Sequence, residues 1–335
     1  MLRPAGRVLS TAFQRTIWSE EVVHSVYAVG RRLVDGVHRA VSGRDAGFLI
    51  LFASVLLATF AWYVSKEAVN ASAQRDFESR TDEIRSAVRD RMIVYEQVLW
   101  GGVGLFNASE DVSREEWRDY VAALEVGQQW PGIQGIGFAV PIEPAELDSH
   151  VAEVRAQGFP DYSVTPAGPR ETYTSIVFLE PFDERNQRAF GYDMWSNDLR
   201  REAMMRSRVT GAAATSRAIT LVQETENDVQ RGFLTYVPVF ETAAGETALL
   251  ASDGEFAGWV YAAFRMGDLM EGALNSDFRD ISFEIFDQPS AREEFLLFDS
   301  DTDFRGSQLL DGSRMHGSAT VELQGREWLI NFQAG

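Results

Sequence analysis

One uncharged apolar segment constrains this chain more than any other feature. Residues 46–65 (AGFLILFASVLLATFAWYVS) contain no charged side chain. As a helix that rises about 1.5 Å per residue, they extend about 30 Å, the thickness of the hydrocarbon core of a bilayer. The segment starts too far into the chain, and is too long, to be the apolar part of a cleaved signal peptide. It therefore predicts a transmembrane helix over residues 46–65; the alternative is a buried helix of a soluble protein.

Charge is distributed unequally on the two sides of this segment. Residues 1–45 contain seven arginines and four acids, a net charge of +3, and the whole chain has −19, so residues 66–335 carry −22. Short arginine-rich flanks stay in the cytoplasm. We therefore expect an inner-membrane protein with residues 1–45 in the cytoplasm and residues from about 66 onward in the periplasm. Such an acidic exported part argues against nucleic acid as a partner.

Helical periodicity flanks the apolar segment on both sides. Valines spaced three and four apart predict a helix over residues 20–41, which lies on the inner membrane surface or serves only as a connection. Residues 66–112 predict a stalk helix, because Phe77, Ile84, Val88, Tyr95 and Leu99 repeat at helical spacing. This apolar stripe needs a partner, either a second copy of the stalk or the domain that it carries. We expect a homodimer through the stalk.

The remainder of the chain alternates helical and strand patterns. Ser113 and Glu116 form a capping box that opens a helix, and Gly211 is placed to end another. Helices are predicted over 113–129, 144–157, 197–210 and 267–274. Strands are predicted over 133–142, 162–165, 172–179, 218–223, 232–240, 256–265, 281–287, 294–298, 319–323 and 328–332, with a hairpin turn at 324–325. The predicted fold class is α+β: a transmembrane helix, a long stalk helix, then two antiparallel-sheet units over 113–240 and 241–335.

Several separated blocks resemble, in the same order, the CHASE family. They are GLFNAS (104–109), EWRDYV (116–121), PGIQGIGFA (131–139), the stretch from YTSIVFLE to TLVQE (173–224) and GFLTYVPVF (232–240). CHASE domains are extracytoplasmic sensory domains of histidine kinases and nucleotide cyclases, including the cytokinin receptors. The resemblance implies two PAS-like units, a membrane-distal one over 113–240 that binds a small molecule and a membrane-proximal one over 241–335. It also implies a second span and a cytoplasmic output domain beyond Gly335.

The resemblance also points to a candidate ligand site. In the cytokinin receptors an Asp ahead of a conserved Tyr reads the ligand; here Glu171 lies in that region, ahead of Tyr173, and the family's Thr corresponds to Thr215. Because Glu171 stands in the region where the receptors have an Asp, the resemblance does not support an adenine-type ligand. The full candidate set is Glu171, Tyr173, Phe178, Met194, Thr215, Leu221 and Tyr236. Strand alternation places Tyr173 and Val177 on one face and Ile176 and Phe178 on the other. The alternative is that the aromatic residues are core and that Glu171 is a solvated strand end.

A second family pattern, G-x-D…R…G, has a structural interpretation. It comprises Gly191, Asp193, the arginines 200, 201 and 206, and Gly211. We expect Asp193 to cap or brace the following helix, and the arginines to pair with nearby acids.

No motif predicts catalysis or a bound metal. After the apolar segment the chain has two histidines, His150 and His316, which lack metal-ligand spacing and are expected at the surface or in turns. The sequence contains no G-x-S-x-G, P-loop or H-E-x-x-H motif. We therefore expect no enzyme activity, metal or cofactor in this chain. The alternatives to a sensory domain are a membrane-anchored periplasmic hydrolase and a protein-interaction module.

Overall fold

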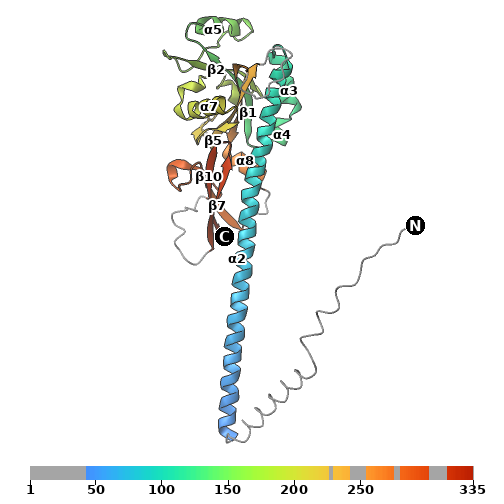
Figure 1. Cartoon of the computed structure of the whole chain (residues 1–335), viewed down its shortest axis with the longest axis vertical. Coiled ribbons are helices and arrows are strands. Elements are labelled where there is room, and N and C mark those ends of the chain that lie inside the picture. The colour runs from blue at the N-terminus through green and yellow to red at the C-terminus, as the bar shows by residue number, and fades with distance from the viewer. Residues whose placement is uncertain (1–42, 226–228, 242–253, 275–279, 302–314, 335) are drawn as a thin grey trace, which may run out of the picture. The chain divides into compact units, whose positions relative to one another are not determined.

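The computed structural model describes residues 43–225, 229–241, 254–274, 280–301 and 315–334. The chain divides into two compact units, residues 1–73 and 74–335. Helix α2, Gly43–Ala108, contains the predicted apolar segment (Figure 1). Within the described residues it is the one helix long and apolar enough to cross a membrane. Phe48, Leu57 and Trp62 are well exposed, as a membrane anchor requires. The helix expected over residues 20–41 lies outside the described residues.

The part of α2 that belongs to the second unit is a core element of that unit. Ile84, Val88, Tyr95 and Leu99 are fully buried in a cluster that includes residues from both sheets of the unit. The domain itself therefore covers the apolar stripe, which no longer argues for a second copy of the chain. The helix ends at Ala108 rather than at residue 112, because Ser113 already caps the next helix.

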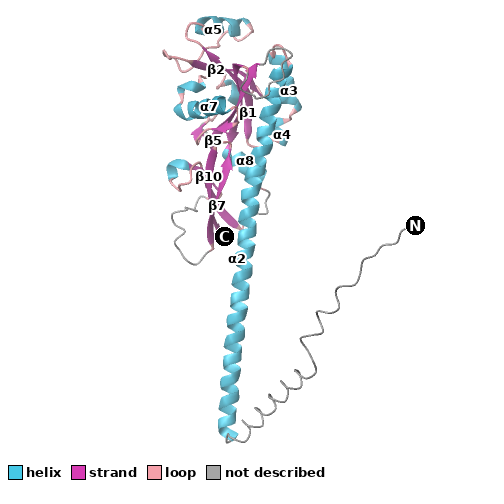
Figure 2. Cartoon of the chain, viewed as in Figure 1, coloured by secondary structure: helices cyan, strands magenta, loops and turns pink. Residues whose placement is uncertain are grey.

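The first sheet has six strands, all antiparallel, in the order β2-β1-β6-β5-β3 with β4 paired to β5 (Figure 2). Its strands are β1 Ile133–Ile142, β2 Tyr173–Glu180, β3 Ala214–Thr215, β4 Ile219–Thr220, β5 Arg231–Glu241 and β6 Glu255–Arg265. One face packs on α2, and the other packs on helix α7, Asp198–Thr210 (Figure 1). This sheet is the platform on which the candidate site residues lie.

The expected boundary at residue 240 is wrong for β6, because this strand belongs to the first sheet. In the structure β6 is a central strand of the first sheet, hydrogen-bonded to β1 on one side and to β5 on the other. The pairing of β5 with β6 continues to Glu241 and Glu255. Residues 242–253, between the two strands, lie outside the described residues.

The second sheet has four strands in the order β8-β7-β10-β9. They are β7 Ile281–Phe286, β8 Leu296–Asp299, β9 His316–Leu323 and β10 Arg326–Ala334. Trp328, Ile330 and Phe332 are fully buried on the face that joins the α2 cluster. The predicted turn at Gln324 and Gly325 joins β9 to β10, and both residues have positive φ, 39° and 73°. Glycine favours this conformation because it has no Cβ.

The remaining helices are short. They are α3 Arg114–Ala123, α4 Val126–Gln129, α5 Leu147–Ala156, α6 Glu184–Gln187, η1 Met194–Ser196, α8 Met266–Ala273 and η3 Glu293–Phe295. Of these, α5 and α8 correspond to predicted helices, whereas α6, η1 and η3 were not predicted. The single helix predicted over 113–129 is divided, because Glu125 adopts a left-handed conformation with φ 50°. Asn197 caps α7 through the N–H groups of Leu199 and Arg200, and Gly211 ends it at φ 67°.

The strand predicted over residues 162–165 is absent. Only Thr165 makes a bridge, to Tyr192, and Pro166 next to it has no N–H to donate to a ladder. Tyr162 is instead buried through its side chain, whose hydroxyl lies 2.5 Å from the Ser175 hydroxyl. The strand predicted over 218–223 shortens to the two residues of β4.

The burial of the α2 stripe gives a first prediction. We expect Leu99→Ala to lower the free energy of unfolding by about 2–5 kcal/mol, because it leaves a cavity in a closed core. Val94→Ala on the same helix, where the side chain is 47% exposed, should change it by less than about 0.5 kcal/mol. Urea unfolding of the full chain in detergent micelles, followed by tryptophan fluorescence, measures both. Equal, small losses would show that the domain does not cover the stripe.

Candidate functional site

The seven candidate residues divide between the two faces of the first sheet. Met194, Leu221 and Tyr236 lie together in the buried cluster on the α7 face. Phe178 lies on the α2 face, where its ring is 6.0 Å from that of Trp117 and 6.2 Å from that of Phe138. The structure therefore brings three of the seven residues together and separates Phe178 from them.

A β-bulge explains why the expected alternation fails at Phe178. Between β1 and β2 the register shifts, so that Phe138 faces Phe178 while the next residue, Ala139, faces Ile176. Val177 and Phe178 consequently both contribute to the α2 face, and Ile176 lies on the α7 face. The prediction that Phe178 and Ile176 share a face is wrong, because a bulge breaks the period of two on which it relied.

The other three candidates have different surroundings. Glu171 is exposed, just ahead of β2. Tyr173 begins β2, and its hydroxyl donates to the Gly168 carbonyl at 2.9 Å. Thr215 is fully buried, and its hydroxyl lies 2.9 Å from the hydroxyl of Thr235 on the neighbouring strand. The hydroxyls of Tyr173 and Thr215 are thus already engaged within the protein.

Asp193 joins β2 to η1, as the sequence predicted for a bracing residue. One carboxylate oxygen accepts the N–H groups of Thr174 at 2.9 Å and Trp195 at 3.0 Å, and the other lies 3.3 Å from a guanidinium nitrogen of Arg170. Burial raises the pKa of Asp193, and the two N–H groups and Arg170 partly offset this. The carboxylate is fully buried, so its role is to fix the start of the segment that leads to α7.

The arginines near α7 follow the expected pattern except for one. Arg201 pairs with Asp198, and Arg206 pairs with Glu202 at 3.5 Å. Arg200 is only 3% exposed and has no carboxylate partner among the described residues. Its guanidinium carbon lies 4.7 Å from the ring centroid of Tyr192. The expectation that Arg200 pairs with an acid is therefore wrong.

Two buried tyrosines share the α7 face with Arg200. Tyr236 on β5 and Tyr261 on β6 are direct cross-strand partners, and their ring centroids are 6.1 Å apart. Both side chains are 0% exposed, and neither hydroxyl has a hydrogen-bond partner in the part of the chain that the structure describes. Burial raises the pKa of both phenols, so both are neutral donors.

Sequence reasoning predicted Tyr236 as a ligand-site residue, but it did not predict Tyr261 or Arg200. A signal for Tyr261 exists in the glycine-rich strand β1, since a Cβ at Gly137 would lie 2.7 Å from the Tyr261 ring. A signal for Arg200 exists in the helical period, because Ala203, Met204 and Ser207 follow it on the buried face of α7. Such a position normally holds an apolar residue.

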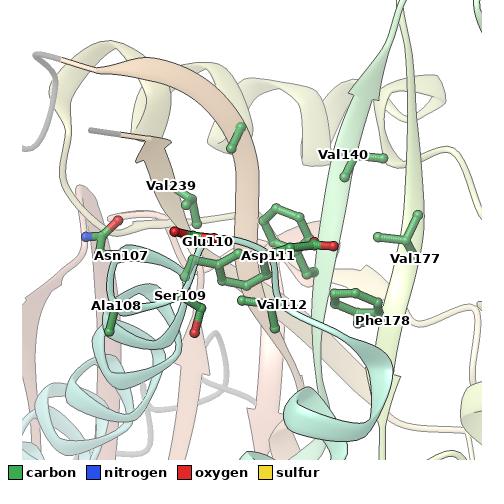
Figure 3. A pocket seen from close by; sticks show the side chains of 13 residues that line it. Asn107, Ala108, Ser109, Glu110, Asp111, Val112, Val140, Val177, Phe178 and Val239 are labelled. Atoms are coloured by element: carbon green, nitrogen blue, oxygen red, sulfur yellow. The ribbon is translucent and has the colours of Figure 1, made fainter. Parts of the chain in front are cut away.

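The α2 face has open cavities near the end of α2 (Figure 3). The first has a volume of about 710 Å³, and the last residues of α2, the acids Glu110 and Asp111, and Phe178 contribute to its walls. A second cavity of about 700 Å³ shares Asp111 and Phe178 with it and extends to His150 on α5. Of the seven predicted residues, only Phe178 lines these two cavities.

A hydrogen-bonded chain holds α5 to the first sheet. His150 Nε2 lies 2.8 Å from the Tyr162 hydroxyl, which lies 2.5 Å from the Ser175 hydroxyl on β2. His150 is half-buried in α5 rather than in a turn. Burial is the largest influence on its pKa and lowers it, with Glu153 acting in the opposite direction. Within the described residues, no group of three or more His, Cys, Asp or Glu side chains is placed to hold a metal ion.

Comparisons with known proteins identify the family. The pattern of the CHASE domain matches residues 110–298, and no curated protein matches the chain. Three solved structures each align with 78% of this chain. A methyl-accepting chemotaxis protein X has 13% sequence identity, 98% of its own chain aligned and a TM-score of 0.41. The ligand-binding domain of the Pseudomonas aeruginosa PAO1 amino acid chemoreceptor PctB in complex with L-Arg has 9% identity, 95% aligned and a TM-score of 0.41, and a domain of a sensory box/GGDEF family protein from Vibrio parahaemolyticus has 8% identity, 97% aligned and a TM-score of 0.43.

The lowered pKa of His150 gives a pH prediction. An unfolded histidine has a pKa of 6.5, and the folded chain holds His150 below it. The unfolded state therefore binds more protons between the two values, and stability is lost as the pH falls through that window. We expect the difference in free energy of unfolding between wild type and His150→Gln to decrease from pH 7 to pH 5. His316→Gln, at an exposed position on β9, is the matched control. A difference that stays constant on acidification would contradict the burial of His150.

Proposed function

Because the chain belongs to the CHASE domain family, we propose that it is a membrane-anchored extracytoplasmic sensory domain. It binds a small molecule and passes the signal through α2 to an output domain outside this sequence, such as a histidine kinase or a nucleotide cyclase. The observation that carries the proposal is the group of buried polar atoms on the α7 face that have no partner among the described residues. Buried polar groups without partners are rare and costly in a domain whose only task is to fold.

The ligand site that we propose lies between α7 and strands β5 and β6. Small-molecule sites are mostly apolar, with a few placed polar groups. Met194 and Leu221 supply apolar walls there, and Tyr236 supplies a hydroxyl without a partner among the described residues. Glu171 at the surface and Phe178 on the α2 face lie outside this site. Tyr173 and Thr215 support it from the strands that they brace.

A route from this site to α2 passes through the turn between β9 and β10. Arg206 on α7 donates to the Thr215 carbonyl at 2.6 Å, and the Thr215 N–H donates to the Gln324 carbonyl at 3.1 Å. The Gln324 side chain donates to the Glu96 carboxylate on α2 at 3.0 Å. A ligand that shifts α7 would therefore bias the position of this turn against α2. Differential binding to two such arrangements is what a sensor requires.

The orientation and assembly that we propose follow from charge and exposure. The net charges of +3 on residues 1–45 and −22 on residues 66–335 favour a cytoplasmic N-terminus. The apolar stripe of α2 is covered by its own domain, so a homodimer would use another part of the helix. Ile93 and Val94, each 47% exposed, are apolar residues available for contact with a second copy.

A single cysteine at Val94 tests orientation and dimerisation together, since the natural sequence contains no cysteine. We expect Val94→Cys to react with a membrane-impermeant maleimide in intact cells whose outer membrane is permeable, and to form crosslinked dimers under oxidation. Leu99→Cys, on the same helix but buried, should do neither. Labelling only after the inner membrane is opened would overturn the orientation. Labelling without crosslinking would overturn the dimer.

Signal transmission requires that ligand binding changes the distance between α7 and α2. We place spin labels at Val94→Cys on α2 and at Val209→Cys on α7, where the side chain is 81% exposed. A metabolite that raises the Tm of the full chain in a thermal-shift screen should shift the distance distribution between the labels. The same labels in a Gln324→Ala background should shift less, because the link to Glu96 is lost. A metabolite that binds without any shift would contradict the proposed route.

A further inference from the structure

Arg200 occupies a position on α7 that faces the protein interior. It is followed by Ala203, Met204 and Ser207 on the same buried face. The next turn of the helix is fixed on the sheet, because the Trp259 indole N–H donates to the Met204 carbonyl at 3.0 Å. Arg200 therefore lies on the buried face of α7, one turn before this contact.

Three donors without partners lie on this part of the sheet. They are the Arg200 Nε–H and the hydroxyls of Tyr236 and Tyr261, none of which finds a hydrogen-bond partner among the described residues. Ala203 and Met204, which share the buried face of α7 with Arg200, lie in the same cluster as Tyr236 and Tyr261, whose ring centroids are 6.1 Å apart. The centroid of the Tyr192 ring lies 4.7 Å from the guanidinium carbon of Arg200.

A comparison with Arg265 shows how unusual this environment is. The Arg265 side chain is 7% exposed, and its nitrogens lie 2.9 Å from the Glu224 carboxylate and 2.5 Å from the Asp268 carboxylate. Arg200, which is 3% exposed, has no such carboxylate in the described part of the chain. A guanidinium stays charged under all physiological conditions, and a buried charge without a partner is costly. The fold therefore holds a cation in its interior without the anion that the other buried arginine has.

We infer that the missing anion is a carboxylate group of the ligand, held by Arg200 together with the hydroxyls of Tyr236 and Tyr261. This inference rests on the proposed function and names the chemical class of the ligand. One guanidinium and two neutral phenols carry a net charge of +1, which one carboxylate neutralises, whereas a phosphate dianion would leave an excess negative charge. The guanidinium fork also matches the two oxygens of a carboxylate.

Tyr192 lies over the proposed site. This residue is partly exposed, and the guanidinium lies over its ring. A bound carboxylate replaces that ring contact with charge-assisted hydrogen bonds, which are about twice as strong as neutral ones. The segment that contains Tyr192 leads into η1 and α7, so displacement of the ring acts on the helix that the proposed route uses.

The stability of two arginine variants tests the inference without knowledge of the ligand. In the ligand-free full chain, we expect Arg200→Met to raise the Tm, by on the order of 4 °C, because it removes an unpaired buried charge. Arg265→Met should lower the Tm, because it leaves Glu224 and Asp268 without their cation. If Arg200→Met lowers the Tm as Arg265→Met does, the guanidinium has a structural partner and the inference is overturned.

A ligand panel tests the same inference from the other side. Mono- and dicarboxylates of two to six carbons are compared with their carboxamides, at equal ionic strength, for their effect on the Tm of the full chain in detergent. We expect a carboxylate that raises the Tm of wild type and of Arg201→Met but not of Arg200→Met, while its carboxamide has no effect. If no carboxylate raises the wild-type Tm, the inference is overturned. A neutral metabolite that raises the Tm of wild type and Arg200→Met equally would overturn it and leave the sensory function intact.

Discussion

The packing of α2 into the second unit is the interaction on which the rest of the structure depends. Tyr95 shows this most clearly: its ring stacks on Phe264 of β6 at 5.5 Å, and its hydroxyl donates to the Pro131 carbonyl ahead of β1. One turn later, Leu99 lies in the same fully buried cluster as Trp117 of α3 and Trp328 of β10. Both sheets bury their apolar faces on this helix, so neither sheet has a complete core without it.

This arrangement gives the two faces of the first sheet different properties. On the α2 face, aromatic and aliphatic side chains close a continuous apolar core that extends into the second sheet. On the α7 face, the core is smaller and contains a charged guanidinium and two phenol hydroxyls without partners among the described residues. Apolar burial is the main source of stability, whereas unpaired buried polar groups reduce it. The indole N–H groups of Trp117 and Trp328 in the α2 cluster also lack partners among the described residues, but only the α7 face has an unpartnered charged group of this kind, and there we place the proposed site.

The sequence predicted those features that depend on a few neighbouring residues. The capping box at Ser113 and Glu116 and the terminating Gly211 both act within one turn of a helix, and the structure has each of them. The place of β6 depends on its pairing with β1, as in Ala139 with Trp259, across more than a hundred residues of chain. The bulge opposite Phe178 depends on the register of two strands and leaves no local pattern. Local sequence patterns could therefore predict neither the position of β6 nor the bulge.

Arg200 shows why the candidate site was harder to predict than the fold. In the sequence Arg200 is one of several arginines near several acids, so an ion pair with one of these acids is the natural expectation. The helical period determines the difference: Arg201 pairs with Asp198, whereas Arg200 lies on the buried face of α7 and contacts the Tyr192 ring. A charge in that position weakens the ligand-free fold. The proposed carboxylate of the ligand would neutralise this charge. In the function that we propose, binding at this charge would stabilise α7 on the sheet and act on α2 through the hydrogen bonds of Thr215 and Gln324.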